Sequence, residues 1–452
     1  MAKSSVKFVC SNCGAQFAAW AGRCSTCGEW NTLTEEEIII SSKSGGKSSG
    51  GKALKSFIPG QITKENKVKR LAAGIGDVDE VLGGGVVPGS VILIAGEPGI
   101  GKSTLLLDVA ARLSSQNPVL YVSGEESTHQ VGMRAKRLGI GASKLEIASS
   151  TSADDIAASI SSKKYGVVFV DSIQTMTVDG VASSAGSVSQ ITNSTHLLMN
   201  AGKQSNTAVV MVGHVTKEGN IAGPKILEHV VDVVLNLEGD RYGGFKILRS
   251  VKNRFGSTNE AGIFEMQEEG LVQVDNPSAS LLAERQDSDG SVVLATMQGS
   301  RPLLVEVQTL VNKTSYGYPK RAASGIDLNR VNLLVAMLEK RTKLNLSEQD
   351  IYVNIVGGIK INEPAADLAI CMAIGSASKG LKLRGKAVVF GEVGLSGEVR
   401  RVAFAEKRIA EAKKLGFDTV IGPNIKLIKK DLASIYKPVS TVKDALNTYL
   451  KK

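Results

Sequence analysis

The sequence predicts an α/β fold in which a mostly parallel sheet follows a small cysteine-rich module and precedes a second α/β domain. Two Cys-x-x-Cys pairs lie within the first 27 residues, and a glycine-rich loop at residues 96–103 joins an apolar run to a helical pattern. Apolar runs then alternate with helical patterns to the C-terminus. We therefore expect a ribbon at 1–35, a flexible linker at 36–60, the core at 61–280 and the second domain at 281–452.

Composition describes an ordinary globular chain. Of its 452 residues, 42% are hydrophobic and 22% are charged, which excludes a disordered protein. No apolar run reaches the ~18–20 residues that span a bilayer, and residues 1–10 lack the apolar segment of a secretory signal, so we expect a cytoplasmic protein without a membrane partner. The formal net charge of +10 favours a polyanionic partner, most often nucleic acid, although solubility alone would also explain it.

Four of the five cysteines form two close pairs near the N-terminus. They are Cys10, Cys13, Cys24 and Cys27. Four thiolates at this spacing can converge on Zn²⁺, whereas a redox dithiol usually has a single pair, so we predict a structural zinc ribbon. We expect Phe17, Trp20 and Trp30 to shield the metal. Cys371 lies in an apolar helical pattern and is interpreted as a core residue rather than a nucleophile.

The middle of the chain has the pattern of a buried parallel sheet. Residues 40–54 are rich in Ser, Gly and Lys and predict the flexible linker. The short apolar runs that follow are rich in β-branched residues, which is typical of strands buried on both faces. The expected core strands are 91–95, 119–123, 167–171, 208–213, 231–237, 245–251 and 262–267. In the second domain we expect strands at 292–295, 304–310, 352–355 and 387–391, and helices at 330–340 and 365–378.

The loop after the first core strand fits the pattern G-x-x-x-x-G-K-[ST]. Its residues are Gly96, Glu97, Pro98, Gly99, Ile100, Gly101, Lys102 and Ser103, with Thr104 next in the following helix. Backbone N–H groups of such a loop, together with the helix N-terminus, hold the phosphates of a nucleotide, here ATP. Lys102 is expected to reach the β/γ-phosphates, and the Ser103 hydroxyl is expected to ligate Mg²⁺.

Polar residues follow three of the other core strands. Asp171 ends the strand at 167–171, where a carboxylate can hold Mg²⁺ beside the phosphate loop. Glu125 follows the strand at 119–123 and can orient and deprotonate the attacking water, with Glu126 as the alternative one residue away. His214 follows the strand at 208–213 and is either a γ-phosphate sensor or a structural residue.

This order of motifs resembles the RecA-like ATPase core. The segment Lys-Asn-Arg-Phe-Gly at residues 252–256 is more specific, because it resembles the signature of the bacterial RadA (also called Sms) family of DNA repair proteins. Lys252 and Arg254 lie two residues apart on an expected strand, so their side chains share a face. The resemblance implies that they act on the γ-phosphate of a neighbouring subunit, in the manner of an arginine finger, and that the chain forms a hexameric ring.

The same resemblance implies an ATP-driven motor on single-stranded and branched DNA that works beside the RecA recombinase. The loops after Asp171 and after His214 would then line the ring channel and contact phosphates without reading sequence. Two alternatives share the same core: a nucleotide-dependent regulatory switch ATPase, and a zinc-anchored recombination adaptor that does not translocate.

Residues 285–452 resemble the Lon protease domain. The resemblance is carried by Asn-Glu-Pro-Ala-Ala-Asp at 362–367 and by Gly-Glu-Val-Gly-Leu-Ser-Gly at 391–397. Ala365 stands where the family has its Ser nucleophile, and Glu406 stands at the matching Lys position, although Lys407 is adjacent. Because no acyl-enzyme forms without an oxygen nucleophile, we expect a proteolytically inactive scaffold.

Overall fold

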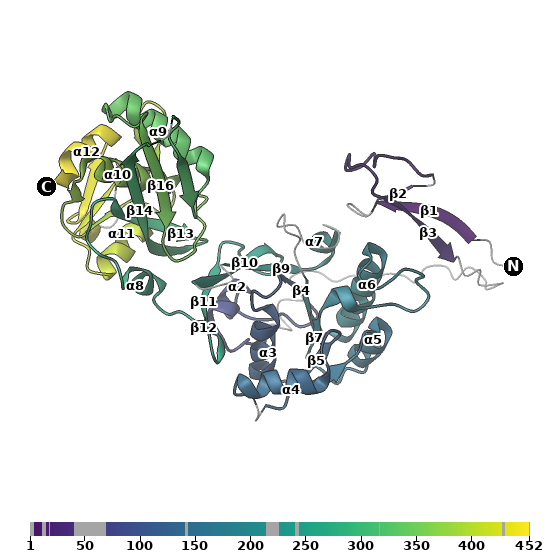
Figure 1. The fold of residues 1–452 in the computed structure, drawn as a ribbon. Helices are drawn as coiled ribbons and strands as arrows, with labels where there is room; N and C mark the ends of the chain where they lie inside the picture. Colours follow the sequence, from purple (N-terminus) through teal and green to yellow (C-terminus); the bar gives the residue numbers. More distant parts are fainter. Residues whose placement is uncertain are drawn as a thin grey trace. The chain divides into compact units, whose positions relative to one another are not determined.

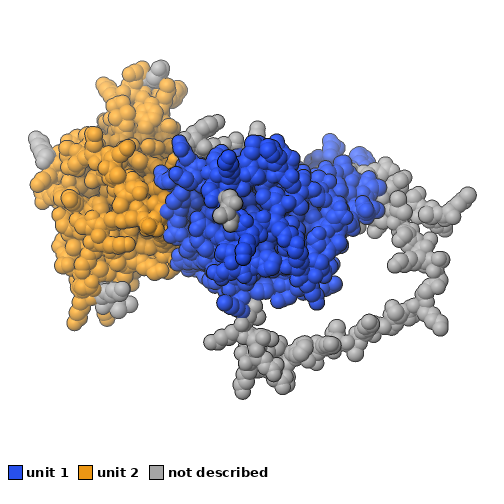
Figure 2. Space-filling view, turned by 90° about the horizontal axis from the view of Figure 1, so that it is seen from below, with its two compact units in different colours: residues 1–238, 246–273 blue, residues 239–245, 274–452 orange. Residues whose placement is uncertain are grey.

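The computed structural model describes residues 4–10, 15–17, 19–39, 69–140, 143–213, 226–239, 244–315, 317–426 and 430–451. Cys13, His214 and the core of the expected linker at 40–54 lie outside these residues. The chain divides into two compact units (Figures 1 and 2), one formed by residues 1–238 with 246–273 and the other by residues 239–245 with 274–452. The continuous C-terminal part of the second unit thus begins at Val274, several residues before the expected boundary at 281.

The N-terminal ribbon is an antiparallel sheet with strand order β2-β1-β3. Its strands are β1 (Ser4–Cys10), β2 (Gln16–Phe17) and β3 (Leu33–Ile39). β3 pairs with β1 along its whole length, from Leu33 opposite Cys10 to Ile39 opposite Ser4. The expectation that a flexible linker starts at residue 36 is therefore wrong, because the ribbon needs β3 up to Ile39 to pair the backbone of β1.

The core of the first unit is a nine-stranded sheet with the order β12-β11-β10-β9-β4-β8-β7-β5-β6. The run from β9 to β6 is parallel throughout, which confirms the predicted parallel core. Its strands are β4 (Val91–Gly96), β5 (Val119–Ser123), β6 (Glu146–Ser149), β7 (Val167–Asp171), β8 (Ala208–Val212) and β9 (Val233–Gly239). Sequence analysis missed β6, because this edge strand is only partly buried and lacks a continuous apolar run.

Helices cover both faces of the parallel strands (Figure 1). Successive residues point to opposite faces, so Ile92 and Ile94 pack in one apolar cluster while Val91 and Leu93 pack in the other. The first cluster includes residues of α2 (Gly76–Val81), α3 (Lys102–Leu113) and α4 (Thr128–Arg137). The second includes residues of α5 (Ala153–Ser161), α6 (Val188–Ser205) and α7 (Ile226–Val230).

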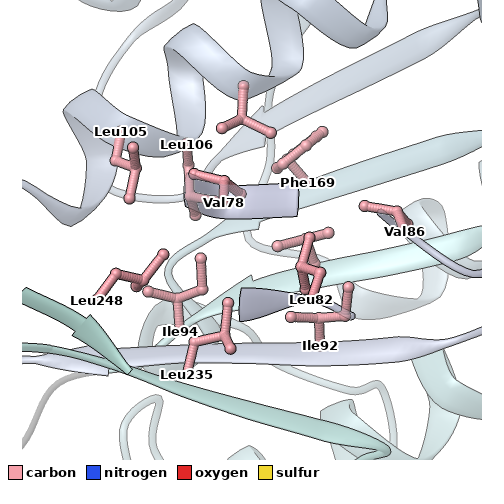
Figure 3. Close-up of a pocket in the computed structure, with 12 residues that line it drawn as sticks. Val78, Leu82, Val86, Ile92, Ile94, Leu105, Leu106, Phe169, Leu235 and Leu248 are labelled. Atoms are coloured by element: carbon pink, nitrogen blue, oxygen red, sulfur yellow. The ribbon is translucent and has the colours of Figure 1, made fainter. Parts of the chain in front are cut away.

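The first cluster encloses a small cavity between α2, α3 and the sheet (Figure 3). The residues that line it include Val78, Leu105, Phe169 and Leu235, and all of its lining side chains are apolar. Cavities of this kind stay dry because water finds no hydrogen-bond partners in them. The cavity is therefore a packing defect of the core and offers no polar group to a ligand.

Three further strands extend the sheet beyond β9. They are β10 (Phe245–Asn253), β11 (Ala261–Gln267) and β12 (Gly270–Gln273). β11 and β12 form an antiparallel hairpin in which Met266 lies opposite Leu271. The hairpin is joined to α2 by the buried Asp77 carboxylate, which accepts a hydrogen bond from Ile263 N at 2.9 Å.

The second unit is built on a seven-stranded mixed sheet with the order β15-β16-β14-β13-β18-β21-β22. These strands are β13 (Ser291–Gln298), β14 (Arg301–Lys313), β15 (Arg321–Ser324), β16 (Gln349–Ile355), β18 (Ala387–Val389), β21 (Thr419–Pro423) and β22 (Tyr436–Val439). Two short ribbons pair β17 (Lys382–Leu383) with β23 (Leu450–Lys451), and β19 (Glu392–Val393) with β20 (Val399–Arg400).

One helix of the second unit is buried almost all round. The helices are α8 (Pro277–Leu282), α9 (Leu328–Thr342), α10 (Asp367–Lys379), α11 (Ala405–Lys414) and α12 (Val442–Tyr449). Asp367 through Ser376 of α10 are buried, including Cys371, whose thiol pKa is raised by burial. Cys371 is therefore a core residue, as predicted.

An ion pair between a buried arginine and a partly buried glutamate ties three elements of the second unit together. Arg408 of α11 is only 1% exposed, and its guanidinium donates to both carboxylate oxygens of Glu363, at 2.6 and 2.9 Å. Arg408 also donates to the carbonyl of Ala295, while Glu363 accepts from Thr296 Oγ1, and both of these residues belong to β13. Burial acts to raise the pKa of Glu363, but Arg408 and the other donors hold it below its usual value.

Removing one partner of this pair is expected to destabilise the second unit strongly. Glu363→Ala leaves the Arg408 guanidinium buried without its counter-charge, which costs about 3–5 kcal/mol of unfolding free energy. Denaturant unfolding measures this loss. Because the folded-state pKa of Glu363 is lowered, its contribution is present above the ordinary carboxylate pKa and disappears as the pH falls through the lowered value.

Glu398→Ala is the matched control, since Glu398 pairs with Arg400 at the surface and its loss is expected to cost under about 1 kcal/mol. Equal unfolding free energies for the two variants would contradict a structural role for the buried pair.

Candidate functional site

The loop at residues 96–103 joins β4 to α3, as the motif requires. Gly101 has a φ of 113°, and a Cβ there would lie 2.8 Å from Met266 Cε, so only glycine fits. Glu97, Pro98 and Gly99 are exposed, whereas Ile100 is buried under the loop. Ser103 and Thr104 are half-buried in the first turn of α3, where helical N–H groups lack partners within the helix. The arrangement offers an anion site at the carboxyl end of β4.

Lys102 is held against the loop by its own backbone. Its ammonium donates to the carbonyls of Gly96 at 2.8 Å and Glu97 at 2.9 Å, and the residue is only 4% exposed. Burial lowers the pKa of Lys102 to about 8, while the Asp171 and Glu125 carboxylates act in the opposite direction. The carboxylates of Asp171 and Glu125, at the ends of other strands, therefore favour the charged form of Lys102.

The two carboxylates reach this site from neighbouring strands. β5 and β7 run in parallel register with Ser123 beside Asp171, so the residues that follow each strand meet at one edge of the sheet. The Tyr121 hydroxyl donates to Asp171 Oδ2 at 2.5 Å, and the Ser172 hydroxyl donates to Glu125 Oε1 at 2.5 Å. Burial and the Asp171 carboxylate raise the pKa of the Tyr121 phenol well above its usual value, so Tyr121 is a hydrogen-bond donor here.

Glu125 and Glu126 have different surroundings. The Glu126 carboxylate forms an ion pair with Arg134 of α4, whereas that of Glu125 accepts a hydrogen bond from Ser172. Gly124 makes this turn possible, because a Cβ at that position would lie 2.2 Å from Thr175 Oγ1. Sequence analysis missed Gly124, Tyr121 and Arg134. Gly124 precedes the two acidic residues and carried a usable signal, but Tyr121 is hidden in an apolar run.

The segment after Asp171 is organised by a buried glutamine. Gln190 of α6 accepts a hydrogen bond from Val178 N at 2.9 Å and donates to the carbonyls of Val181 and Ser183 at 3.0 Å. This expected DNA loop is thus anchored to α6 at one end and reaches Glu125 through Ser172 at the other. The second expected loop, after His214, lies outside the described residues up to 225.

Lys252 and Arg254 lie at the opposite end of the parallel strands. Arg254 pairs with Asp232 at 3.1 Å, and Asp232 accepts a hydrogen bond from Val91 N at 3.1 Å, where β4 begins. The Lys252 ammonium donates to the carbonyls of Glu228, His229 and Val231 at 2.8 to 3.0 Å. Because β4 spans the six residues from Val91 to Gly96, about 16 Å of strand separates these cations from the phosphate loop of their own chain.

Three of the four predicted zinc ligands come together in the ribbon. The Sγ atoms of Cys10, Cys24 and Cys27 lie within 4.8 Å of one another, with 3.7 Å between Cys10 and Cys27, while Cys13 lies outside the described residues. Cys10 and Cys24 are buried. A compact group of thiols is a donor set that suits Zn²⁺.

Of the three aromatic residues expected to shield the metal, only one packs against the cysteines. Phe17 packs against the cysteine cluster. The indoles of Trp20 and Trp30 are instead 60% and 67% exposed, and they flank Gly22. The Arg23 guanidinium lies 5.8 Å from the Trp30 ring centroid. The prediction is wrong for the tryptophans because in so small a ribbon β1, β3 and the turns enclose the thiols without them.

The Lon-like positions of the second unit form part of its core. Ala365 is buried in a short 3-10 helix, η2 (Pro364–Ala366), and its carbonyl accepts a hydrogen bond from Gly391 N at 2.8 Å. Lys407 Nζ donates to the carbonyl of Ser300 at 3.1 Å and lies over the Phe404 ring. Ala365 therefore supplies no hydroxyl nucleophile at this position. The Lys407 ammonium is bound to the Ser300 carbonyl and lies over the Phe404 ring instead.

Comparisons with known proteins match all three regions. Residues 8–35 match the family described as rubredoxin metal binding domain, residues 63–220 the AAA domain, and residues 326–425 the family described as subunit ChlI of Mg-chelatase. Curated proteins called DNA repair protein RadA are 49% identical in Bacillus subtilis (94% of this chain and 93% of the relative) and 44% identical in Aquifex aeolicus (99% of each). The chain belongs to the RadA family of DNA repair proteins. As a RadA family member with an AAA domain and a phosphate loop, it is an ATP-hydrolysing enzyme.

The family resemblance and the α/β fold class predicted from the sequence are confirmed by these matches. Among the described residues, no helix is both long and apolar enough to cross a membrane.

One zinc ion per chain is expected in the purified protein, bound through Cys24 and its neighbours. Cys24→Ser should lower the zinc content from one equivalent to none and unfold the ribbon, because a domain of this size depends on its metal. Elemental analysis of the full chain measures the zinc, and ADP binding reports that the phosphate loop is intact.

Cys371→Ala is the control, since Cys371 is buried in α10 and should leave the zinc content unchanged. Full zinc occupancy in the Cys24 variant would contradict the assignment.

Proposed function

We propose that the chain is a DNA-dependent ATPase that works as a homo-hexameric ring motor on single-stranded and branched DNA in the cytoplasm. In this role it promotes branch migration of recombination intermediates together with the RecA recombinase. The observation that carries the proposal is the separation of two charge clusters by the length of one parallel strand. The phosphate loop and two carboxylates lie at one edge, and Arg254 and Lys252 lie at the other.

At the first edge each residue has a distinct role. The loop N–H groups and Lys102 bind the phosphates of ATP, and Thr104 extends this cradle toward the α-phosphate. Ser103 and Asp171 would hold Mg²⁺, which supplies charge neutralisation to the β- and γ-phosphates when bound. The donor set fits, because a hydroxyl and a carboxylate are oxygen ligands of the kind that Mg²⁺ takes. Glu125 orients the attacking water and accepts its proton.

The second edge completes the site of the next subunit. Because about 16 Å of strand lies between Arg254 and its own phosphate loop, the guanidinium cannot serve that loop. Copies arranged head to tail around a ring would bring the cations of one subunit to the γ-phosphate held by another, with His214 as a candidate sensor from the same subunit as the loop. An arginine finger acting in this way stabilises the charge of the transition state.

Contact with DNA would act on the site through Ser172. This residue starts the loop that is anchored by Gln190, and its hydroxyl is bonded to the Glu125 carboxylate at 2.5 Å. A DNA strand that moves the loop would therefore also move the proposed catalytic base. The second unit, as an inactive Lon-like domain with Ala365 at the nucleophile position, would serve as an assembly scaffold.

Glu125 and Glu126 are expected to differ sharply in a DNA-stimulated ATPase assay. Glu125→Gln should lower kcat by about 10²–10⁴-fold, because it removes the base but keeps the shape of the side chain. Glu126→Gln should stay within about fivefold of the unmodified chain, since it weakens only the partly exposed pair with Arg134. Lys102→Ala gives the background, and phosphate release with and without single-stranded DNA is the measurement. Hydrolysis indifferent to DNA would favour the zinc-anchored adaptor.

Mixing two inactive variants tests the shared site. Arg254→Ala should lower ATP hydrolysis by about 10³-fold and Lys102→Ala should abolish it. In an equal mixture about one quarter of the interfaces join an intact Lys102 to an intact Arg254, so a corresponding share of activity should return. Strand displacement on a forked substrate then separates a motor from a regulatory switch. If the mixture hydrolyses ATP no faster than the two variants measured separately, a site shared between subunits is ruled out.

A further inference from the structure

The strand order leaves one direction for the nucleoside of ATP. Asp171 ends β7 and Glu125 follows β5. Both strands lie on the β8 side of β4, so the γ-phosphate end of the nucleotide faces that way. The phosphate chain runs along the loop from the γ-phosphate near Lys102 to the α-phosphate near Thr104. The ribose and base must therefore leave on the other side of β4, toward β9, β10 and the β11–β12 hairpin.

The hairpin packs directly against the end of the phosphate loop. A Cβ at Gly101 would lie 2.8 Å from Met266 Cε and 2.9 Å from Leu271 Cδ1, so both side chains touch the loop at its last turn. A Cβ at Gly270 would lie 3.3 Å from Thr104 Cγ2 and 2.9 Å from Leu138 Cδ2. The hairpin thus lies beside Thr104, near the α-phosphate from which the ribose and base extend.

Met266 is the exposed apolar side chain on its face of β11 and β12. Side chains on this face of β11 and β12 include Phe264 and Leu271, which are buried, whereas Met266 at the end of the row is 42% exposed. Met266 belongs to neither apolar cluster of the first unit, and its thioether lies beside the anion site. A flexible, polarisable thioether suits the face of an aromatic ring.

We propose that Met266, supported by Leu271, forms a nucleobase shelf on which the base of the bound nucleotide packs. This inference rests on the proposed ATP site and adds to it the surface that binds the nucleoside. The shelf supplies binding and no chemistry, because it lies on the opposite side of β4 from Asp171 and Glu125. It also contacts the face of the base and not its hydrogen-bonding edge, so it favours a stacked ring without requiring one particular base.

Met266→Ala in the full chain tests the shelf. A sulfur–aromatic contact of the usual strength predicts that the Kd for ADP and the KM for ATP rise about two- to tenfold, with kcat unchanged. Inorganic tripolyphosphate is the decisive second probe. It carries the phosphates without a nucleoside, so its inhibition constant should be the same in the variant and in the unmodified chain.

Val272→Ala is the matched control, because Val272 is 38% exposed on the opposite face of the same hairpin and should change neither constant. Equal weakening of ADP and tripolyphosphate would overturn the shelf in favour of a general effect on the loop, and unchanged ADP binding would overturn it outright. A chain that binds ADP normally but ignores DNA would refute the proposed motor and leave the shelf intact.

Discussion

The parallel direction of the six central strands is the constraint on which the rest of the first unit depends. Since these strands run the same way, the residues that follow them gather at one edge, and those that precede them gather at the other. Lys102, Asp171 and Glu125 belong to the first edge, and Asp232 with Arg254 belongs to the second. A single chain therefore carries two charge clusters that are separated by the length of β4.

The groups at the first edge are arranged around an anion site. Lys102 is buried and its pKa is lowered to about 8, with two loop carbonyls and two carboxylates around it. Phosphate oxygens would compete with the carbonyls for the same ammonium, and the loop glycines let the backbone approach closely. The carboxylates have their own donors in Tyr121 and Ser172, so their geometry does not depend on the lysine.

The sequence predicted those parts of the molecule that local patterns specify. The apolar runs of β4, β5 and β7 identified the buried sheet, and the spacing of Gly96 and Lys102 identified the loop. Contacts between residues far apart in the sequence could not be predicted in this way: Tyr121 donates to Asp171 fifty positions away, and Met266 of the β11–β12 hairpin packs against Gly101 of the phosphate loop. The exposed position of Trp30 was missed for the same reason, because its burial depends on packing across the whole ribbon and not on its own apolarity.

The two cations at the second edge differ in how readily they can leave their present partners. An ammonium has three hydrogens, and Lys252 donates to three carbonyls at the end of α7, so a new acceptor must replace one of them. Burial, and then the charge of Arg254, lowers the pKa of Lys252. The Arg254 side chain is 51% exposed and has five donors, and Asp232 orients it through one side-chain contact while also bonding the start of β4. Of the two, Arg254 is thus the better placed cation for the proposed contact with a phosphate of a neighbouring subunit, and Lys252 fixes the end of α7 beside it.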